Sequence, residues 1–281
     1  AKAGLASINE DKELWEDRVT EIRMIVFDSQ TGNAEYNGKL SFPNGFSQRS
    51  DAIRFKAGTY NFYFIANESA YTGDFRTALS SIAKESDFST DTRFSNIQYN
   101  PNFVPDGTDN EGLFLMSAQY SNIQVASGGT KENPTPLSLP DGRVELVRAL
   151  AKVEVIFRKK VSESSITPNS IASIQLSNVA SAYTVPTSDI YYAGIESKSN
   201  MIVPQDFNYA NDSIGAVTFY IPELLRQEGT TEFTALKINK SSFVVETDEQ
   251  KVGLTEQRRS IGSLSNTRSI RNYHYKLNAY L

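Results

Sequence analysis

The stretch Ile270–Leu281, I-R-N-Y-H-Y-K-L-N-A-Y-L, decides the fold class of this chain. From its fourth residue onward, Tyr273, Tyr275, Leu277, Ala279 and Leu281 alternate strictly with His274, Lys276, Asn278 and Tyr280. A period of two residues is typical of a strand with one face in the core. Val144–Phe157, V-E-L-V-R-A-L-A-K-V-E-V-I-F, alternates in the same way near the middle of the chain. Two such runs predict two β-rich halves.

Shorter apolar runs between turn residues extend this prediction to the rest of the chain. Glu21–Phe27 and Thr59–Asn67 carry apolar side chains on both faces. Strands with that pattern are usually covered on both sides. Further predicted strands are Gly112–Ala118, Ala216–Ile221, Glu232–Ile238 and Ser242–Thr247.

One segment of the first half has helical rather than strand spacing. In Asp74–Lys84, apolar residues recur at i, i+3, i+4 and i+7 after an aspartate in the N-cap position; they are Phe75, Ala78, Leu79 and Ile82. We expect a short helix there, over one open end of the first half. Ser86–Gly112 and Ser127–Pro136 are predicted to be surface loops.

The length of 281 residues suffices for two domains, each with its own core. Fully extended, Val144–Phe157 would measure about 46 Å, which is more than one ordinary strand needs. We therefore expect one continuous strand shared by two β-sandwich domains, which comprise residues 1–147 and 148–281.

The composition excludes several functional classes. The net charge is −5 and the basic residues are scattered, which argues against nucleic acid as a partner. Arg158–Lys160 is the densest basic cluster and is typical of a solvated strand end. The chain has no cysteine, which excludes disulfides, thiolate catalysis and sulfur-bound metals. No run of about 18 apolar residues predicts a membrane helix.

No catalytic, cofactor-binding or metal-binding residue is predicted, and we expect no enzyme activity. His274 is the single histidine and lies on the polar phase of the last strand. Asp106–Gly112 is rich in oxygen ligands, but its spacing departs from a calcium loop and favours a solvated turn. Asn67-Glu68-Ser69 is one of three glycosylation sequons, which carry no weight in a chain rich in Asn and Ser. Sugars would instead need exposed aromatic rings, for which the candidates are Tyr71, Tyr99, Tyr191 and Tyr192.

Five short elements occur in a distinctive order along nearly the whole chain. They are V-T-E-I-R-M-I-V-F-D at Val19–Asp28, G-x-Y-x-x-x-x-x-A-N at Gly58–Asn67, R-A-L-A-K-V-E-V at Arg148–Val155, F-Y-I-P-E at Phe219–Glu223 and R-N-Y-H-Y at Arg271–Tyr275. Together they resemble the Bacteroidales fimbrillin family, whose members form surface filaments called type V pili.

The resemblance implies an all-β fold with two transthyretin-like β-sandwich domains in tandem and a short helix in the first. It also implies export as a lipoprotein precursor and cleavage after an arginine, which removes the first strand. Ala1–Asp17 contains no alternating apolar run before Trp15, so we expect the processed form. The implied location is a cell-surface fimbrium, associated with the outer membrane through the assembled filament.

A sandwich without its first strand exposes an apolar groove and unpaired main-chain groups. A strand from another fimbrial subunit could fill that groove, which is donor-strand exchange. Four or five buried apolar side chains would contribute roughly 6–15 kcal/mol before ordering costs. Such head-to-tail contacts propagate as a filament.

The role within the filament depends on the end of the chain. A C-terminal donor segment was trimmed, or Leu264–Leu281 is itself the donor, or the chain is an accessory subunit that only receives a strand. We favour the accessory subunit, at the tip or the anchor of the fimbria. The alternative function is a surface adhesin that binds a glycan or a host protein.

Overall fold

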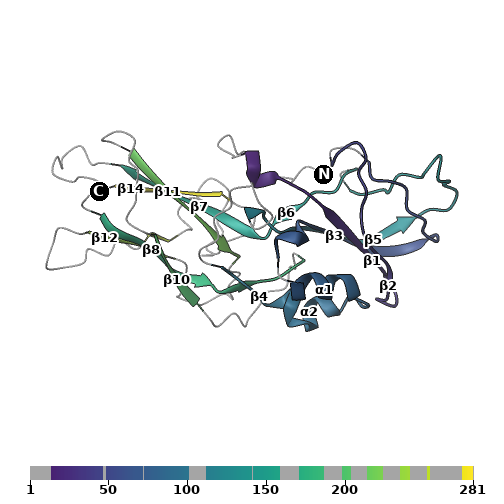
Figure 1. The fold of residues 1–281 in the computed structure, drawn as a ribbon, viewed down its shortest axis with the longest axis horizontal. Coiled ribbons are helices and arrows are strands. Elements are labelled where there is room, and N and C mark those ends of the chain that lie inside the picture. Colours follow the sequence, from purple (N-terminus) through teal and green to yellow (C-terminus); the bar gives the residue numbers. More distant parts are fainter. Residues whose placement is uncertain are drawn as a thin grey trace. The chain divides into compact units, whose positions relative to one another are not determined.

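The structure is a computed structural model, and it describes residues 14–46, 49–71, 73–100, 112–140, 142–158, 171–186, 198–203, 214–223, 235–240, 252–253 and 274–280 (Figure 1). The chain divides into two compact units. The first comprises Ala1–Ile97, Phe103–Ala149 and Tyr183–Asp189, and the second comprises Gln98–Asn102, Leu150–Ala182 and Ile190–Leu281. The change at Ala149–Leu150 lies two residues from the predicted division at 147, but the exchanged short segments were not foreseen.

One antiparallel sheet forms the frame of the first unit. Its strand order is β2-β1-β3-β5-β6. The central pair, β1 and β3, runs in register from Ile22 opposite Ala66 to Asp28 opposite Tyr60. The strands are β1 (Ile22–Asp28), β2 (Ala34–Lys39), β3 (Gly58–Ala66), β5 (Met116–Val125) and β6 (Val147–Arg148).

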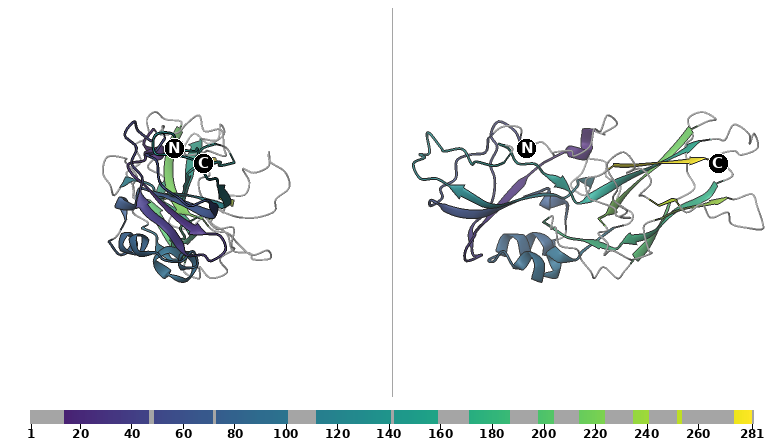
Figure 2. Two further views of the ribbon diagram at one scale, coloured as in Figure 1. Left: turned by 90° about the vertical axis from the view of Figure 1, so that its right-hand side faces the viewer. Right: turned by 180° about the vertical axis from the view of Figure 1, so that it is seen from behind.

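Helices cover one face of this sheet, as Figure 2 shows. They are α1 (Gly73–Ser81), α2 (Asp87–Thr90) and α3 (Thr92–Ser95). Two 3-10 helices, η1 (Leu14–Asp17) and η2 (Glu68–Ala70), precede β1 and α1 in the chain, respectively. The predicted helix at Asp74–Lys84 is thus confirmed as α1, although it ends at Ser81. The prediction of one long loop at Ser86–Gly112 is wrong, because α2, α3 and β4 (Ile97–Gln98) lie within it.

The two faces of β1 and β3 bury different aromatic clusters, which explains why both strands are apolar on both sides. On the helix-covered face, the ring of Phe27 meets Tyr63 at 5.5 Å and Phe88 of α2 at 6.0 Å between centroids. On the opposite face, Phe62 stacks on Phe64 at 6.4 Å and contacts Phe55 at 6.0 Å. In the described part of the chain, no helix has the length and apolar character needed to span a bilayer.

The second unit contains two sheets, which Figure 1 shows as two layers. One sheet has the order β11-β7-β14, in which β11 is antiparallel and β14 parallel to β7. The other sheet has the order β10-β8-β12-β13. A two-stranded sheet joins β4 to β9 (Ala182–Tyr183). The remaining strands are β7 (Leu150–Arg158), β8 (Ile171–Ala180), β10 (Lys198–Val203), β11 (Ile214–Pro222), β12 (Ala235–Lys240), β13 (Val252–Gly253) and β14 (His274–Tyr280).

The prediction of one continuous strand over Val144–Phe157 is wrong. Two strands lie there, because the hydrogen-bonding partner changes from β5 to β11 and β14. The break falls at Ala149, whose N–H donates to the carbonyl of Leu115 at 2.9 Å. The strand predicted at the end of the chain is confirmed as β14. The strand predicted at Ser242–Thr247 lies outside the described residues. The described part of the first unit is one sheet covered by helices, and the secondary structure of the described residues as a whole is predominantly β.

Phe27→Ala should lower the free energy of unfolding by about 3–5 kcal/mol, because the ring is fully buried between the sheet and the helices. Urea unfolding measures this change. Phe42→Ala is the matched control: its ring is half-exposed and contacts Phe46, so the loss should stay below about 1.5 kcal/mol. Equal losses in the two variants would contradict this description of the core.

Candidate functional site

The described residues provide no evident chemistry of catalysis or metal binding. Within them, no three His, Asp or Glu side chains gather closely enough to hold a metal ion. His274 begins β14, in register with Lys152 of β7. The oxygen-rich segment 106–111 lies outside the described residues. The absence of catalytic, cofactor and metal residues therefore stays a prediction.

The tyrosines proposed to stack on sugars are not exposed where the structure describes them. Tyr99 is 8% exposed, and its hydroxyl donates to the main-chain carbonyl of Tyr220. Tyr71 packs on Phe75 at 5.6 Å and on Tyr183 at 6.5 Å, and burial raises the pKa of its hydroxyl. The prediction is thus wrong for these two residues. Contacts distant in sequence bury Tyr99, and Tyr71 is half-buried; 191–192 lie outside the described residues.

The outer edge of β5 is the candidate assembly site, because its strand pairing is incomplete there. On its inner side, β5 pairs with β3 from Met116 opposite Ala66 to Val125 opposite Gly58. On the outer side, β6 pairs only with Met116 and Ser117. In the described part of the chain, no strand lies beside Ser121–Val125 on that side. An edge of this kind offers main-chain groups to another strand.

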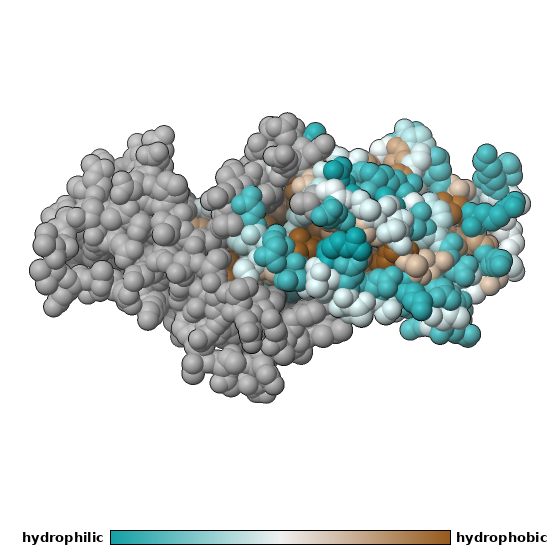
Figure 3. Space-filling view, turned by 60° about the horizontal axis from the view of Figure 1, so that its bottom comes forward, coloured by the Kyte–Doolittle hydropathy of each residue, from teal (hydrophilic) through white to brown (hydrophobic). Residues whose placement is uncertain are grey.

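The apolar face of the sheet is also less covered at this edge. Ile123 and Val125 are half-buried and lie opposite Tyr60 and Gly58, past a bulge in the strand. Farther in, Phe62 on the same face is 1% exposed. Figure 3 brings forward the other side, on which α1 and α2 lie; there hydrophilic side chains predominate and apolar residues show between them. A strand added beside β5 would cover the half-exposed apolar side chains as well as the main chain.

Asn67 holds the segment that leads into β1. Its amide oxygen accepts from the N–H of Thr20 at 2.9 Å and from the Thr20 hydroxyl at 3.2 Å. Its amide nitrogen donates to the carbonyls of Arg18 and Phe114, both at 2.8 Å. These four bonds use the full capacity of a primary amide. Asn67 is fully buried and has φ 63°. The burial of its amide agrees with giving its sequon no weight.

A buried ion pair anchors the same segment a few residues earlier in the chain, at Glu16. Nη1 of Arg148 donates to Oε2 of Glu16 at 2.6 Å, and the two side chains are 2% and 0% exposed. The guanidinium lies over the ring of Phe114 at 5.8 Å from its centroid. Arg148 and Asn67 belong to two of the five elements that carry the family resemblance. Their role is therefore the internal positioning of the entry to the first sheet.

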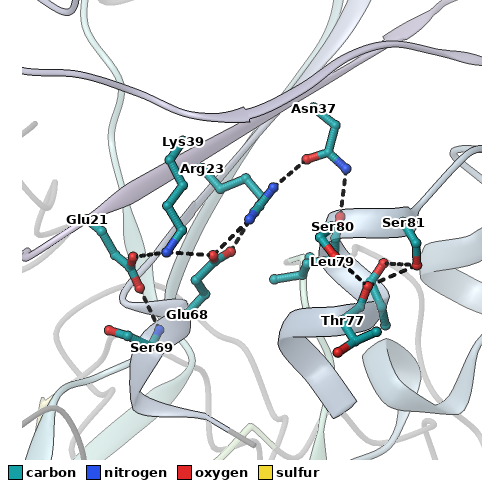
Figure 4. A network of polar contacts seen from close by, with 11 residues as sticks. Glu21, Arg23, Asn37, Lys39, Glu68, Ser69, Thr77, Leu79, Ser80 and Ser81 are labelled. Carbon is teal, nitrogen blue, oxygen red and sulfur yellow. Dashed lines mark hydrogen bonds and ion pairs between the residues drawn. The ribbon is translucent and has the colours of Figure 1, made fainter. Parts of the chain in front are cut away.

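A second polar network ties the edge strand β2 to its surroundings (Figure 4). Arg23 of β1 binds Glu68 through Nε at 2.6 Å and Nη2 at 2.9 Å, and it donates through Nη1 to Asn37 at 2.8 Å. Asn37 in turn donates to the carbonyl of Leu79 in α1 at 2.7 Å. A bidentate arginine–carboxylate pair is strong and directional. The network therefore fixes β2 against β1 and α1.

Glu21 and Lys39 extend this network toward solvent. Lys39 pairs with Glu68 at 3.0 Å and with Glu21, whose other oxygen accepts from the N–H of Ser69 at 2.6 Å. Burial raises the pKa of Glu21, but the hydrogen bonds from Lys39 and Ser69 outweigh it and hold the pKa below its ordinary value of 4.5. The carboxylate thus stabilises the folded state in its charged form.

The chain is similar to known fimbrial proteins. No protein-family model matches it. It is 38% identical over 158 residues to the minor fimbrium tip subunit Mfa3 of Porphyromonas gingivalis, and the match covers 54% of this chain and 33% of that relative. The solved structure of the C-terminally truncated tip fimbrial protein Mfa3 has a TM-score of 0.65 at 23% identity, covering 94% of this chain and 90% of that one. A fimbrial assembly protein from Parabacteroides distasonis has a TM-score of 0.53 at 12% identity, covering 96% and 86%.

The fold is therefore that of the β-rich fimbrial proteins of these bacteria. These similarities confirm the resemblance to the Bacteroidales fimbrillin family. The relatives are named as fimbrial components, in agreement with the predicted location on a cell-surface fimbrium.

Asn67→Ala should lower the free energy of unfolding by about 1–3 kcal/mol, because it leaves the buried carbonyl of Phe114 without its donor and removes the part-buried bonds to Arg18 and Thr20. Asn67→Gly, which is free of strain at positive φ, should remain within about 1 kcal/mol of the alanine variant. Chemical denaturation measures both. A glycine variant as stable as the wild type would show that the backbone conformation, and not the amide, matters.

Glu21→Gln should destabilise the chain at neutral pH and lose this effect in acid. Because the folded pKa of Glu21 is lowered, its contribution is complete above the unfolded pKa of about 4.5 and disappears as the pH falls through the folded pKa. Urea midpoints between about pH 3 and pH 7 measure the gap between variant and wild type. Exposed Glu132→Gln is the control. A gap that is constant with pH would contradict the assignment.

Proposed function

We propose that this chain is an accessory subunit of a bacterial surface fimbria, at its tip or its anchor, and that it accepts a strand from a neighbouring subunit. Its sequence similarity to the tip subunit Mfa3 supports the role. Since the match covers a third of that relative, the role of the whole protein is part of the proposal. The finer architecture of two transthyretin-like sandwich domains, divided near residue 147, is proposed with it.

The observation that carries this proposal is the outer edge of β5. Main-chain hydrogen bonds along Ser121–Val125 would bind a donor strand. The apolar face of the sheet would determine which side chains are accepted at every second position of that strand. Burying the rest of Ile123 and Val125 would contribute about 1.5–3 kcal/mol in total. Because this contribution is modest, the apolar side chains of the donor strand must supply most of the remaining free energy of binding.

The arrangement of β14 bears on which subunit donates the strand. His274–Tyr280 pairs in parallel with Lys152–Arg158, so this segment already occupies the edge of a sheet in its own chain. To act as a donor it would have to leave β7. We therefore favour the accepting role over the hypothesis that Leu264–Leu281 is the donor, and the proposed partner is another fimbrial subunit.

Ile123→Lys combined with Val125→Lys should reduce incorporation of the chain into fimbriae at least about tenfold, because a charge on an apolar strand edge blocks pairing. The measurement is the amount of chain in fimbriae sheared from the producing bacterium, relative to the amount in whole cells. Gln119→Lys, an exposed position on the same strand, is the matched control and should be incorporated like the wild type.

Urea unfolding of the purified variants establishes that each is folded. Two results would contradict the proposal. One is that the wild-type chain is absent from the sheared fimbriae, which would dismiss the subunit role. The other is normal incorporation of the doubly charged variant, which would dismiss the β5 edge as the accepting site.

A further inference from the structure

Strand β6 begins later in the chain than its sequence indicates. The alternation of apolar and polar residues predicts a strand from Val144 onward. In the structure, β6 consists of Val147 and Arg148 alone, and these two residues pair with β5. The residues that lead into it, Arg143–Leu146, form no ladder with β5. Something other than the sequence pattern therefore ends the pairing.

In its present register, a longer β6 would lie along the outer edge of β5. Two further hydrogen-bonded pairs would form there, Glu145 opposite Gln119 and Arg143 opposite Ser121. In the described part of the chain, no strand lies beside Gln119 or Ser121 on this side. The segment before β6 is thus a possible occupant of the edge that we propose as the accepting site.

The hydrogen bonds that already exist show which groups this longer ladder would use. In an antiparallel pair of strands, hydrogen-bonded and non-bonded residue pairs alternate. The N–H of Ala149 donates to the carbonyl of Leu115 at 2.9 Å, so that pair is hydrogen-bonded. By the same alternation, the N–H of Glu145 and the carbonyl of Arg143 would both point toward β5.

The hydroxyl of Tyr120 binds these same two groups. It accepts from the N–H of Glu145 at 2.8 Å and donates to the carbonyl of Arg143 at 3.4 Å. A tyrosine hydroxyl can accept and donate at the same time. Its ring contacts the ring of Phe64 edge-on at 6.1 Å between centroids and lies opposite Phe62, on the apolar face of the sheet. The segment is therefore bound to a side chain on that face, and not to the edge of β5.

The side chains of the segment suit the ladder that it does not form. Val144 is half-buried and would lie opposite Tyr120 on the apolar face. Arg143 and Glu145 would lie on the other face, beside Gln119, which is exposed. Cross-strand pairs of this kind stabilise a sheet. The residue types thus favour a longer β6, and the bonds to Tyr120 oppose it.

We propose that Tyr120 is a positioning residue that keeps the accepting edge of β5 open. Its hydroxyl takes the main-chain groups through which Arg143–Glu145 would otherwise pair with β5. Without the hydroxyl, β6 grows to Arg143–Arg148, and the unpaired stretch of β5 shrinks from Ala118–Val125 to Asn122–Val125. This role rests on the proposed function, because an incoming strand needs that stretch. The competition between hydroxyl and ladder, however, takes place within the isolated chain.

A single hydroxyl suffices because the two arrangements are closely balanced. Main-chain bonds that form at a solvated edge replace bonds to water, so the net contribution of each is small. Extending β6 also fixes more of the backbone, which costs conformational entropy. Tyr120 binds a donor and an acceptor at once, and its ring is already held in the sheet by Phe64.

Tyr120→Phe tests this role, since it removes the hydroxyl and keeps the ring. Amide hydrogen exchange of the full chain, followed by NMR residue by residue, is the measurement. The N–H groups of Gln119 and Ser121 should exchange at least about tenfold more slowly than in the wild type, because they enter the longer ladder. Tyr36→Phe is the matched control: this tyrosine is half-buried on the other edge strand, β2, contacts Phe55, and should leave both rates unchanged.

A double variant separates the longer ladder from other effects of the lost hydroxyl. In Tyr120→Phe combined with Glu145→Pro, the proline has no N–H to donate to Gln119, so β6 cannot extend past Leu146. Gln119 and Ser121 should then exchange as fast as in the wild type. In sheared fimbriae, Tyr120→Phe should be incorporated at least about threefold less than the wild type, and the double variant should recover the wild-type amount.

Unchanged exchange of Gln119 and Ser121 in Tyr120→Phe would overturn the proposal, as would slow exchange that persists in the double variant. Slow exchange together with normal incorporation of Tyr120→Phe would overturn its role in assembly. Absence of the wild-type chain from the fimbriae would instead dismiss the proposed function, and the exchange result for the isolated chain would stand.

Discussion

The first unit depends on one saturated polar contact, the side-chain amide of Asn67. A strand can enter a sheet only if the residues before it have partners for their main-chain groups. Residues 18–21, directly before β1, form no ladder, and Asn67 supplies these partners at Arg18 and Thr20 while also binding Phe114. The left-handed backbone of Asn67 places that amide after the last residue of β3. Asparagine tolerates this conformation better than most residues do.

Buried polar groups of this kind also fix the path of the chain in a fold whose core is largely aromatic. Apolar residues of similar volume can replace one another at modest cost. Asn67, Arg148 and Glu16 cannot be exchanged so freely, since each loss leaves a partner unsatisfied in the interior. Asn67 and Arg148, which belong to the elements that resemble the fimbrillins, fix chain positions, and the outer edge of β5 is one place where the described part of the sheet is open to another strand.

The spacing of apolar residues predicted β1, β3, β14 and α1. In β1, β3 and α1 the local pattern agrees with the burial of the side chains. The break at Ala149 does not follow from the sequence, since both strands keep the same alternation and only their partners change. In α2 and α3, Phe88 and Phe94 alone bury their side chains, and the polar residues around them hid these short helices. The sequence predicted a groove with unpaired main-chain groups. The strand at which it lies, β5, could be identified only from the strand pairing in the structure.

The short segments exchanged between the units have a consequence for biosynthesis. Tyr183–Asp189 belongs to the first unit, where the N–H of Val185 donates to the carbonyl of Phe94 and the ring of Tyr183 contacts Tyr71. The first unit therefore cannot complete its core when its first 149 residues leave the ribosome. Completion of that core requires the nascent chain to extend as far as Val185, past β7 and β8 of the second unit.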